Sequence, residues 1–142
     1  MSVNKAMLVG NLGADAEIKT TQNGKKFANC SLATSKSYKD KDGQRVEKTQ
    51  WHRIVVWNEG AAGFLEQYGK KGAKIYVEGE IETRKWVTSD GQDRWTTEVV
   101  VHPYTGRIDM IVWPDKEDQG EASPKDQPAV NHPADLEDEV PF

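Results

Sequence analysis

The chain has 142 residues, enough for one ordinary domain with a tail, and its 19 basic and 23 acidic residues give a net charge of −4. No stretch approaches the roughly 20 apolar residues of a membrane-spanning helix, and the N-terminus lacks the pattern of a signal peptide. We therefore expect a cytoplasmic protein. The single cysteine, Cys30, excludes an internal disulfide and lies in the alternating stretch FANCSLAT, which predicts a core thiol on a strand.

Charge and proline content divide the chain near Pro114. Residues 115–142 carry two lysines against nine acidic residues, a net charge of −7, whereas residues 1–114 carry +3. A polar, proline-rich segment cannot bury enough apolar area to offset its chain entropy, so it is expected to be disordered. The predicted organisation is an ordered domain over 1–114, a disordered linker over 115–134 and an acidic tip over 135–142.

Alternating hydrophobicity predicts strands through most of the ordered part. One helix is predicted over 60–72, where Ala61, Phe64, Leu65 and Tyr68 share a face and Gly69 or Gly72 ends the helix. The expected strands, in chain order, are 3–13, 23–37, 47–58, 73–88, 93–103 and a short last one over 106–113.

This order is three strands, one helix, and then two or three strands. A parallel sheet is not expected, because it requires helices that alternate with the strands and only one helix is predicted. Five long strands with a helix between the third and fourth is the order of the OB-fold, an all-β, five-stranded Greek-key barrel. Other small barrels remain open on the pattern alone.

Aromatic and basic residues recur together along two of the expected strands. In QWHRIVVWN, alternation places Trp51, Arg53 and Trp57 on one face, opposite His52, Ile54 and Val56. Further along the chain, Trp86 follows Arg84 and Lys85, and Trp95 follows Arg94.

Aromatic rings stack on nucleic-acid bases, and lysine and arginine neutralise phosphates. This composition therefore favours a binding surface for single-stranded nucleic acid. An isolated tryptophan is more often a packing residue, so the prediction depends on several tryptophans occurring beside cations. Taken individually, Trp95 and Trp113 also fit a core or an interface.

No catalytic or metal-binding pattern accompanies this surface. His52 alternates with the aromatic face, which predicts a core or subunit-contact residue. His102 and His132 have no zinc-ligand spacing to each other or to Cys30. No nucleophile elbow, phosphate loop or HExxH stretch is present. We predict a protein that is not an enzyme and has no cofactor or metal.

These stretches together resemble the bacterial-type single-stranded DNA-binding proteins. VNKAMLVGNLG is similar to the family's first strand, and QWHRIVVWN, KIYVEGEIETRKW and DGQDRWTTEVVV are similar to its third, fourth and fifth. The resemblance covers residues 3–113 and resumes at the last six. It implies an OB-fold that assembles as a homotetramer and wraps single-stranded DNA (ssDNA), with a nucleoid-associated location in the cytoplasm.

The resemblance also implies which residues contact ssDNA. Glu59 and Glu82 depart from the family's pattern, because a basic residue is less surprising at each of these positions. Position 38 is tyrosine where the family commonly has tryptophan, and position 57 is tryptophan where the family commonly has phenylalanine. Both residues keep an aromatic ring face. The implied stacking positions are Tyr38, Trp51, Trp57 and Trp86, and the implied cationic positions are Arg53, Lys70, Lys71, Arg84 and Lys85.

The leading hypothesis is a sequence-tolerant ssDNA-binding protein of replication, recombination and repair. An RNA-binding OB module is the main alternative, because the same surface chemistry suits RNA. A carbohydrate-binding β-module would also use tryptophan platforms, but the adjacent cations and the acidic tail argue against it. A nuclease lacks any visible carboxylate or metal cluster.

The C-terminus ends in an aromatic residue after an acidic run. A terminal ring can enter an apolar pocket while the acids before it meet basic residues at the rim. A purely solubilising tail has no use for that ring. The family's tip is similar, with isoleucine in place of valine, and docks on replication and repair enzymes. The predicted partner-binding residues are Glu137, Asp138, Glu139, Val140, Pro141 and Phe142.

Overall fold

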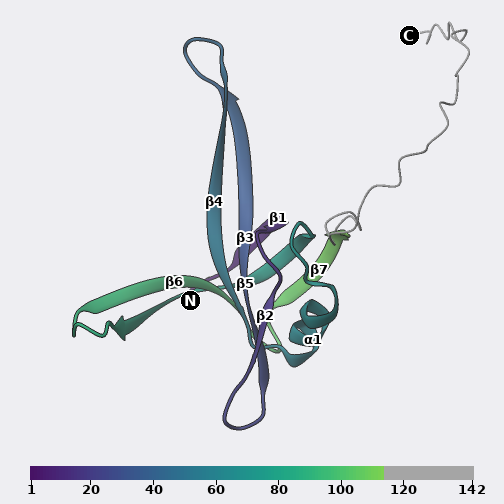
Figure 1. The fold of residues 1–142 in the computed structure, drawn as a ribbon, viewed down its shortest axis with the longest axis vertical. Helices are drawn as coiled ribbons and strands as arrows, with labels where there is room; N and C mark the ends of the chain where they lie inside the picture. Colours follow the sequence, from purple (N-terminus) through teal and green to yellow (C-terminus); the bar gives the residue numbers. More distant parts are fainter. Residues whose placement is uncertain (114–142) are drawn as a thin grey trace, which may run out of the picture.

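The structure is a computed structural model that describes residues 1–113 (Figure 1). The predicted linker, 115–134, and the predicted tip, 135–142, lie outside the described residues. The elements of the described part, in chain order, are β1 (Ala6–Leu12), β2 (Glu17–Thr20), β3 (Lys26–Lys39), β4 (Arg45–Val56), α1 (Glu59–Tyr68), β5 (Lys74–Val87), β6 (Asp93–Val101) and β7 (Arg107–Val112).

Five of these strands close into a barrel. The hydrogen-bonded order is β1–β3–β4–β6–β5, and β5 pairs in turn with β1. β4 and β6 run parallel, whereas the other pairs of the ring are antiparallel. This arrangement confirms the predicted OB-fold. β7 adds to the edge of β5, as the pattern over 106–113 predicted.

The short strand β2 was not predicted. Its four residues, EIKT, include one apolar side chain, Ile18, so they carry almost no periodic signal. β2 forms because the turn after it folds it back antiparallel onto β3. Gly24 in that turn has a positive φ of 80°, a conformation that glycine adopts without steric cost.

The helix begins after Asn58, whose side chain accepts a hydrogen bond from the backbone N–H of Ala61 at 3.1 Å. It packs mainly against β3 and buries Ala62 and Leu65. The predicted helix face is therefore displaced, because Tyr68 is exposed and Ala62 takes the core position. No helix within residues 1–113 is long and apolar enough to cross a membrane.

Alternate residues of the barrel strands fill the core. Leu32, Ile54, Ile75 and Val77 are completely buried. Cys30 is also buried, as predicted, and its burial raises the pKa of the thiol to about 12. A thiol that stays protonated is a poor nucleophile, which agrees with a packing role.

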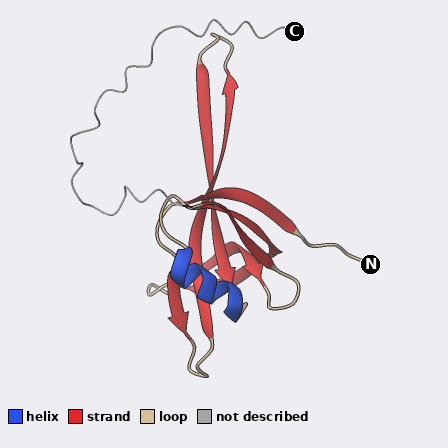
Figure 2. Ribbon diagram, turned by 90° about the vertical axis from the view of Figure 1, so that its right-hand side faces the viewer, coloured by secondary structure: helices blue, strands red, loops and turns tan. Residues whose placement is uncertain are grey.

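Two hairpins continue beyond the barrel as arms. The β3–β4 hairpin and the β5–β6 hairpin project in different directions from the barrel (Figure 1), and α1 lies at the opposite end from the β3–β4 arm (Figure 2). Each arm continues a pair of strands from the barrel wall.

Candidate nucleic-acid interface

The outer face of β4 carries Trp51 and Arg53, as alternation predicted. The core-facing residues Ile54 and Val56 are fully buried, while the ring of Trp51 is 61% exposed. This ring lies against Gly13 in the loop after β1, where an added Cβ atom would lie 2.4 Å from Cζ3 of Trp51. Glycine at this position therefore leaves room for the ring, which a larger residue would displace.

Glu98 on β6 connects this face to the β5–β6 arm. It is 6% exposed, and its Oε1 atom lies 3.1 Å from Nε of Arg84 and 4.0 Å from Nη1 of Arg53. The guanidinium of Arg84 donates a hydrogen bond to Glu98. One buried carboxylate thus holds an arginine from β4 and another from β5 on the same outer surface.

Trp86 lies on this same surface, further along the arm. Residues of one strand that differ by two positions share a face, so Trp86 follows Arg84. Its indole Nε1 donates a 2.8 Å hydrogen bond to the hydroxyl of Thr96 on β6, which fixes the orientation of the ring. The ring stays 43% exposed. The structure therefore brings Trp51, Arg53, Arg84 and Trp86 together.

Trp57 lies near the other end of the β3–β4 pair, directly after β4. Its ring stacks on Phe27 of β3, with ring centroids 4.6 Å apart and an angle of 25° between the planes. Part of one ring face is therefore occupied by the protein. Phe27 was not predicted as a site residue. Alternation along β3, which places Phe27 on the same outer face as Asn29, could have indicated it.

An open pocket of about 460 Å³ lies beside Trp51. Arg53 and Ser31 line it from the sheet, and Asp15 and Glu17 line it from the β1–β2 segment. Its volume is within the range of small-molecule sites, roughly 300 to 1,000 Å³. Arg53 places a positive charge on the β4 side of the pocket, and Asp15 and Glu17 place two carboxylates on the other side.

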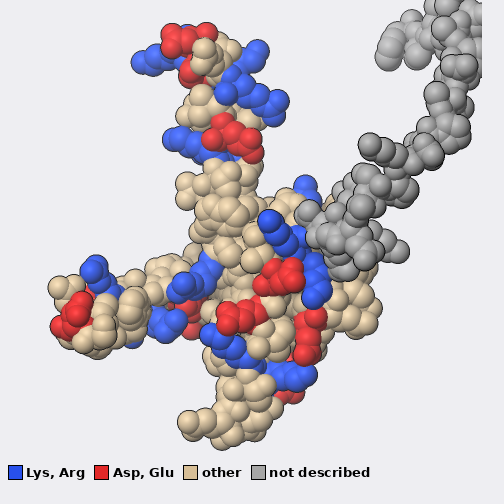
Figure 3. Space-filling view, viewed as in Figure 1, with Lys and Arg blue, Asp and Glu red and all other residues tan. Residues whose placement is uncertain are grey.

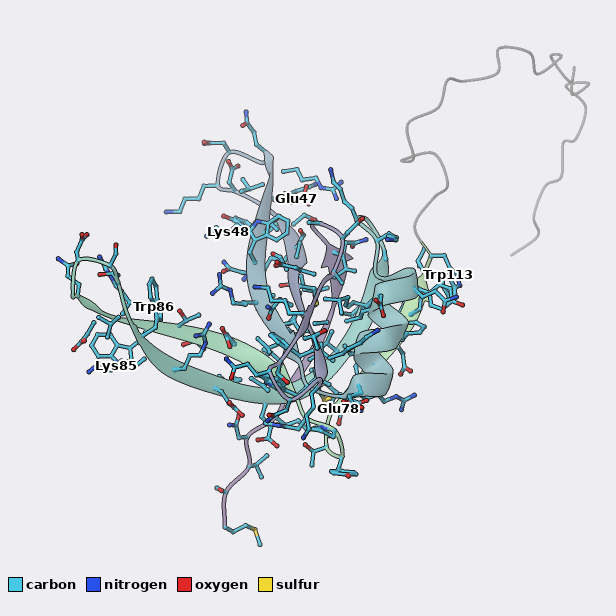
Figure 4. The ribbon with its side chains drawn as sticks, turned by 60° about the horizontal axis from the view of Figure 1, so that its bottom comes forward. Glu47, Lys48, Glu78, Lys85, Trp86 and Trp113 are labelled. Atoms are coloured by element: carbon cyan, nitrogen blue, oxygen red, sulfur yellow. The ribbon has the colours of Figure 1, made fainter. Side chains whose placement is uncertain are left out.

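Tyr38 on the β3–β4 arm lies on the face opposite Trp51. Lys85 on the β5–β6 arm likewise lies on the face opposite Trp86. Tyr38 pairs with Val46 in an uninterrupted register, so alternation places it on the side of β3 that faces away from Trp51. Lys85 pairs with Trp95, and Figure 4 shows Lys85 and Trp86 on opposite sides of their hairpin. The Nζ atom of Lys85 lies 5.9 Å from the centre of the Trp95 ring.

Lys70 and Lys71 follow the helix and contact Asp15. Nζ of Lys70 lies 3.8 Å from Oδ2 of Asp15, and the backbone N–H of Lys71 donates to Oδ1 at 2.8 Å. Asp15 also lines the pocket beside Trp51, so both lysines contact the loop that borders this pocket. Their predicted contact with nucleic acid stays a prediction.

Charge is mixed across the visible surface. Lysine and arginine side chains occur along both arms, and acidic side chains lie among them and at the arm tips (Figure 3). Glu82 belongs to the outer face of β5, where Nε2 of His102 lies 2.7 Å from its Oε1 atom. Sequence reasoning noted Glu82 as unexpected but did not find its partner.

A closed OB barrel with exposed tryptophans and arginines on its outer face is typical of OB-fold nucleic-acid-binding proteins. The model of the Single-strand binding protein family matches residues 3–111. The chain therefore belongs to the single-strand binding protein family, which confirms the resemblance found in the sequence.

Individual relatives agree with this assignment. A single-stranded DNA-binding protein of Rickettsia felis is 42% identical over 149 residues, which cover 99% of this chain and 98% of the relative. One from Rhizobium meliloti is 50% identical over 111 residues, covering 78% of this chain and 64% of the relative. A solved structure described as the Plasmodium falciparum SSB complex with ssDNA has a TM-score of 0.72 and 37% identity, and covers 79% of this chain and 97% of that one.

Replacing Glu98 tests the role of the buried carboxylate. The substitution Glu98→Gln should lower the free energy of unfolding by about 1 to 3 kcal/mol, because Arg53 and Arg84 lose a charged acceptor. Urea unfolding at neutral pH measures this change. Glu47→Gln, which alters an exposed carboxylate on β4, is the control and should change stability by less than about 0.5 kcal/mol. A Glu98→Gln protein as stable as wild type would show that this contact does not hold the surface together.

Proposed function

We propose that the protein binds single-stranded DNA without marked sequence preference and catalyses no reaction. The observation that carries the proposal is the continuous surface from Trp51 to Trp86, linked through Arg53, Glu98 and Arg84. The family assignment and the ssDNA-bound relative support DNA as the ligand. The outer-face rings offer stacking surfaces to any base, which is why sequence preference is expected to be weak.

The two arginines combine a fixed position with free donors. Their side chains are 59% and 61% exposed although both contact Glu98. A guanidinium has five N–H donors, so one contact to the carboxylate leaves others for phosphate oxygens. The arginines are therefore held beside the tryptophan rings before the DNA arrives, which lowers the entropy lost on binding.

The role in replication, recombination and repair is part of the same proposal. A protein that binds exposed strands without reading their sequence suits the coating and protection of ssDNA in all three processes. RNA is the competing ligand. Oligo-rU that binds as tightly as oligo-dT of the same length would favour that alternative, and binding of an oligosaccharide alone would favour a carbohydrate module.

A homotetramer is the proposed assembly. Exposed apolar residues lie on β1 and at the end of β7. They are Met7, Val9, Ile111 and Val112. Such residues are typical of surfaces covered by another subunit. Light scattering should give the mass of four chains, and a monomer at micromolar concentration would contradict this assembly.

The acidic tip is proposed to recruit partner enzymes. Phe142 would enter an apolar pocket on the partner, and Glu137, Asp138 and Glu139 would contact basic residues around it. This proposal is supported by the sequence of the tip and by the relatives that match nearly the whole chain. It gives the protein two binding sites with separate ligands.

Two substitutions test the proposed DNA surface. Trp51→Ala and Trp86→Ala should each weaken binding of labelled oligo-dT by about 1 to 3 kcal/mol, because each loses a stacked base. Fluorescence anisotropy at fixed salt measures the affinity. Trp95→Ala changes an exposed ring on the opposite side of the same arm and should bind nearly as wild type. The surface is assigned wrongly if Trp95→Ala weakens binding and the other two folded variants do not.

Deleting Phe142 tests the tip. The shortened chain should lose capture of helicase or exonuclease partners while its affinity for oligo-dT stays unchanged, because the ring anchors only the protein contact. Pull-down and anisotropy measure the two properties. Asn131→Ala in the predicted linker is the control and should keep both. Partner capture that survives the deletion would rule out the ring as the anchor.

A further inference from the structure

Two carboxylates and an imidazole meet at the base of the β5–β6 arm. Glu80 and Glu82 are two positions apart on the outer face of β5, and His102 follows the end of β6. One ligand atom from each residue lies within 4.8 Å of the others. The hydroxyl of Thr105 donates a hydrogen bond to Oε1 of Glu80 at 3.4 Å. Three possible metal ligands from two segments therefore converge on one point of the surface.

We propose that Glu80, Glu82 and His102 form a binding site for a divalent transition-metal ion of the Zn²⁺ type. Zinc is bound by histidine nitrogen and carboxylate oxygen at about 2.0 to 2.2 Å, which places neighbouring ligand atoms about 3.3 Å apart in a tetrahedral site. The ligand atoms of Glu80, Glu82 and His102 lie within 4.8 Å of one another, and exposed or half-buried side chains can rotate toward a shared ion. Imidazole favours zinc over magnesium and calcium, which take oxygen ligands.

The histidine distinguishes this group from an ordinary acidic patch. Nε2 of His102 lies 2.7 Å from Oε1 of Glu82, so the imidazole already points at the carboxylates. Within residues 1–113, no lysine or arginine forms an ion pair with Glu80 or Glu82, whereas Glu98 on the same face contacts two arginines. A bound cation would offset the repulsion between the two neighbouring carboxylates.

Spacing along the chain could not show this site, and the sequence predicted no metal. Glu82 and His102 are twenty residues apart and become neighbours because β5 pairs antiparallel with β6. The alternation of Glu80 and Glu82 on one strand face was the available signal. This signal did not identify His102 as the third ligand, because His102 comes close only through the pairing of the two strands.

The position of the site gives it a consequence for DNA binding, which rests on the proposed function. Glu82 is two residues from Arg84 on the same face of β5. A divalent ion would cancel the two negative charges beside the arginines. Three protein ligands also leave a fourth zinc position open, and a phosphate oxygen of the bound strand can occupy it. The metal would therefore strengthen ssDNA binding.

Metal binding is tested first without DNA. Isothermal titration of the untagged full-length protein with Zn²⁺ should show one saturable ion per chain. Glu82→Gln and His102→Asn change exposed or half-buried side chains on two different segments, and each should weaken the affinity at least tenfold. His132→Asn removes a histidine outside the described residues and is the matched control, with affinity unchanged. The absence of saturable binding, or equal affinity in wild type, Glu82→Gln and His102→Asn, would overturn the site.

The consequence for DNA is tested separately. At constant ionic strength, Zn²⁺ should raise the affinity of the wild-type protein for oligo-dT several-fold and leave the affinity of His102→Asn unchanged. Equal enhancement in both proteins would overturn the link between the site and DNA. Because the first titration contains no nucleic acid, failure of the metal site and failure of the proposed ssDNA function give different results.

Discussion

Glu98 carries a buried carboxylate at the point where β4, β6 and β5 meet on the outside of the barrel. An uncompensated charge in that position would be costly, so its contacts with Arg53 and Arg84 are required as well as favourable. Those contacts fix an arginine on each side of β6. The tryptophans, two residues from each arginine along their strands, are thereby placed at the two ends of one surface. The proposed stacking platform depends on this arrangement.

The barrel topology makes the arrangement possible. β6 lies between β4 and β5, running parallel to β4 and antiparallel to β5. Residues far apart in sequence therefore share one face. The same pairing brings His102 beside Glu82, so the proposed DNA surface and the proposed metal site have a common structural origin. An ion at that site would offset the negative charges of Glu80 and Glu82.

Much of the fold and part of the site could be predicted from the sequence. Alternation in 47–58 is a local property, and it correctly separated Trp51 and Arg53 from Ile54 and Val56. Glu98 could not be identified, because its burial depends on the parallel pairing of β4 with β6. β2 has too few apolar residues for a periodic signal. Lys85 and Trp86 are neighbours in sequence, but alternation places them on opposite sides of the arm, so the predicted ssDNA contact of Lys85 stays a prediction.

The central claim is that Trp51 and Trp86 belong to one DNA-binding surface that does not include Trp113 beside the helix (Figure 4). Fluorine NMR of protein labelled with 5-fluorotryptophan, assigned with single Trp→Phe variants, observes each ring separately during a titration with oligo-dT. The account predicts that the Trp51 and Trp86 signals shift together with one saturation curve and that the Trp113 signal stays in place. Shifts at Trp113 with unchanged signals from Trp51 and Trp86 would contradict it.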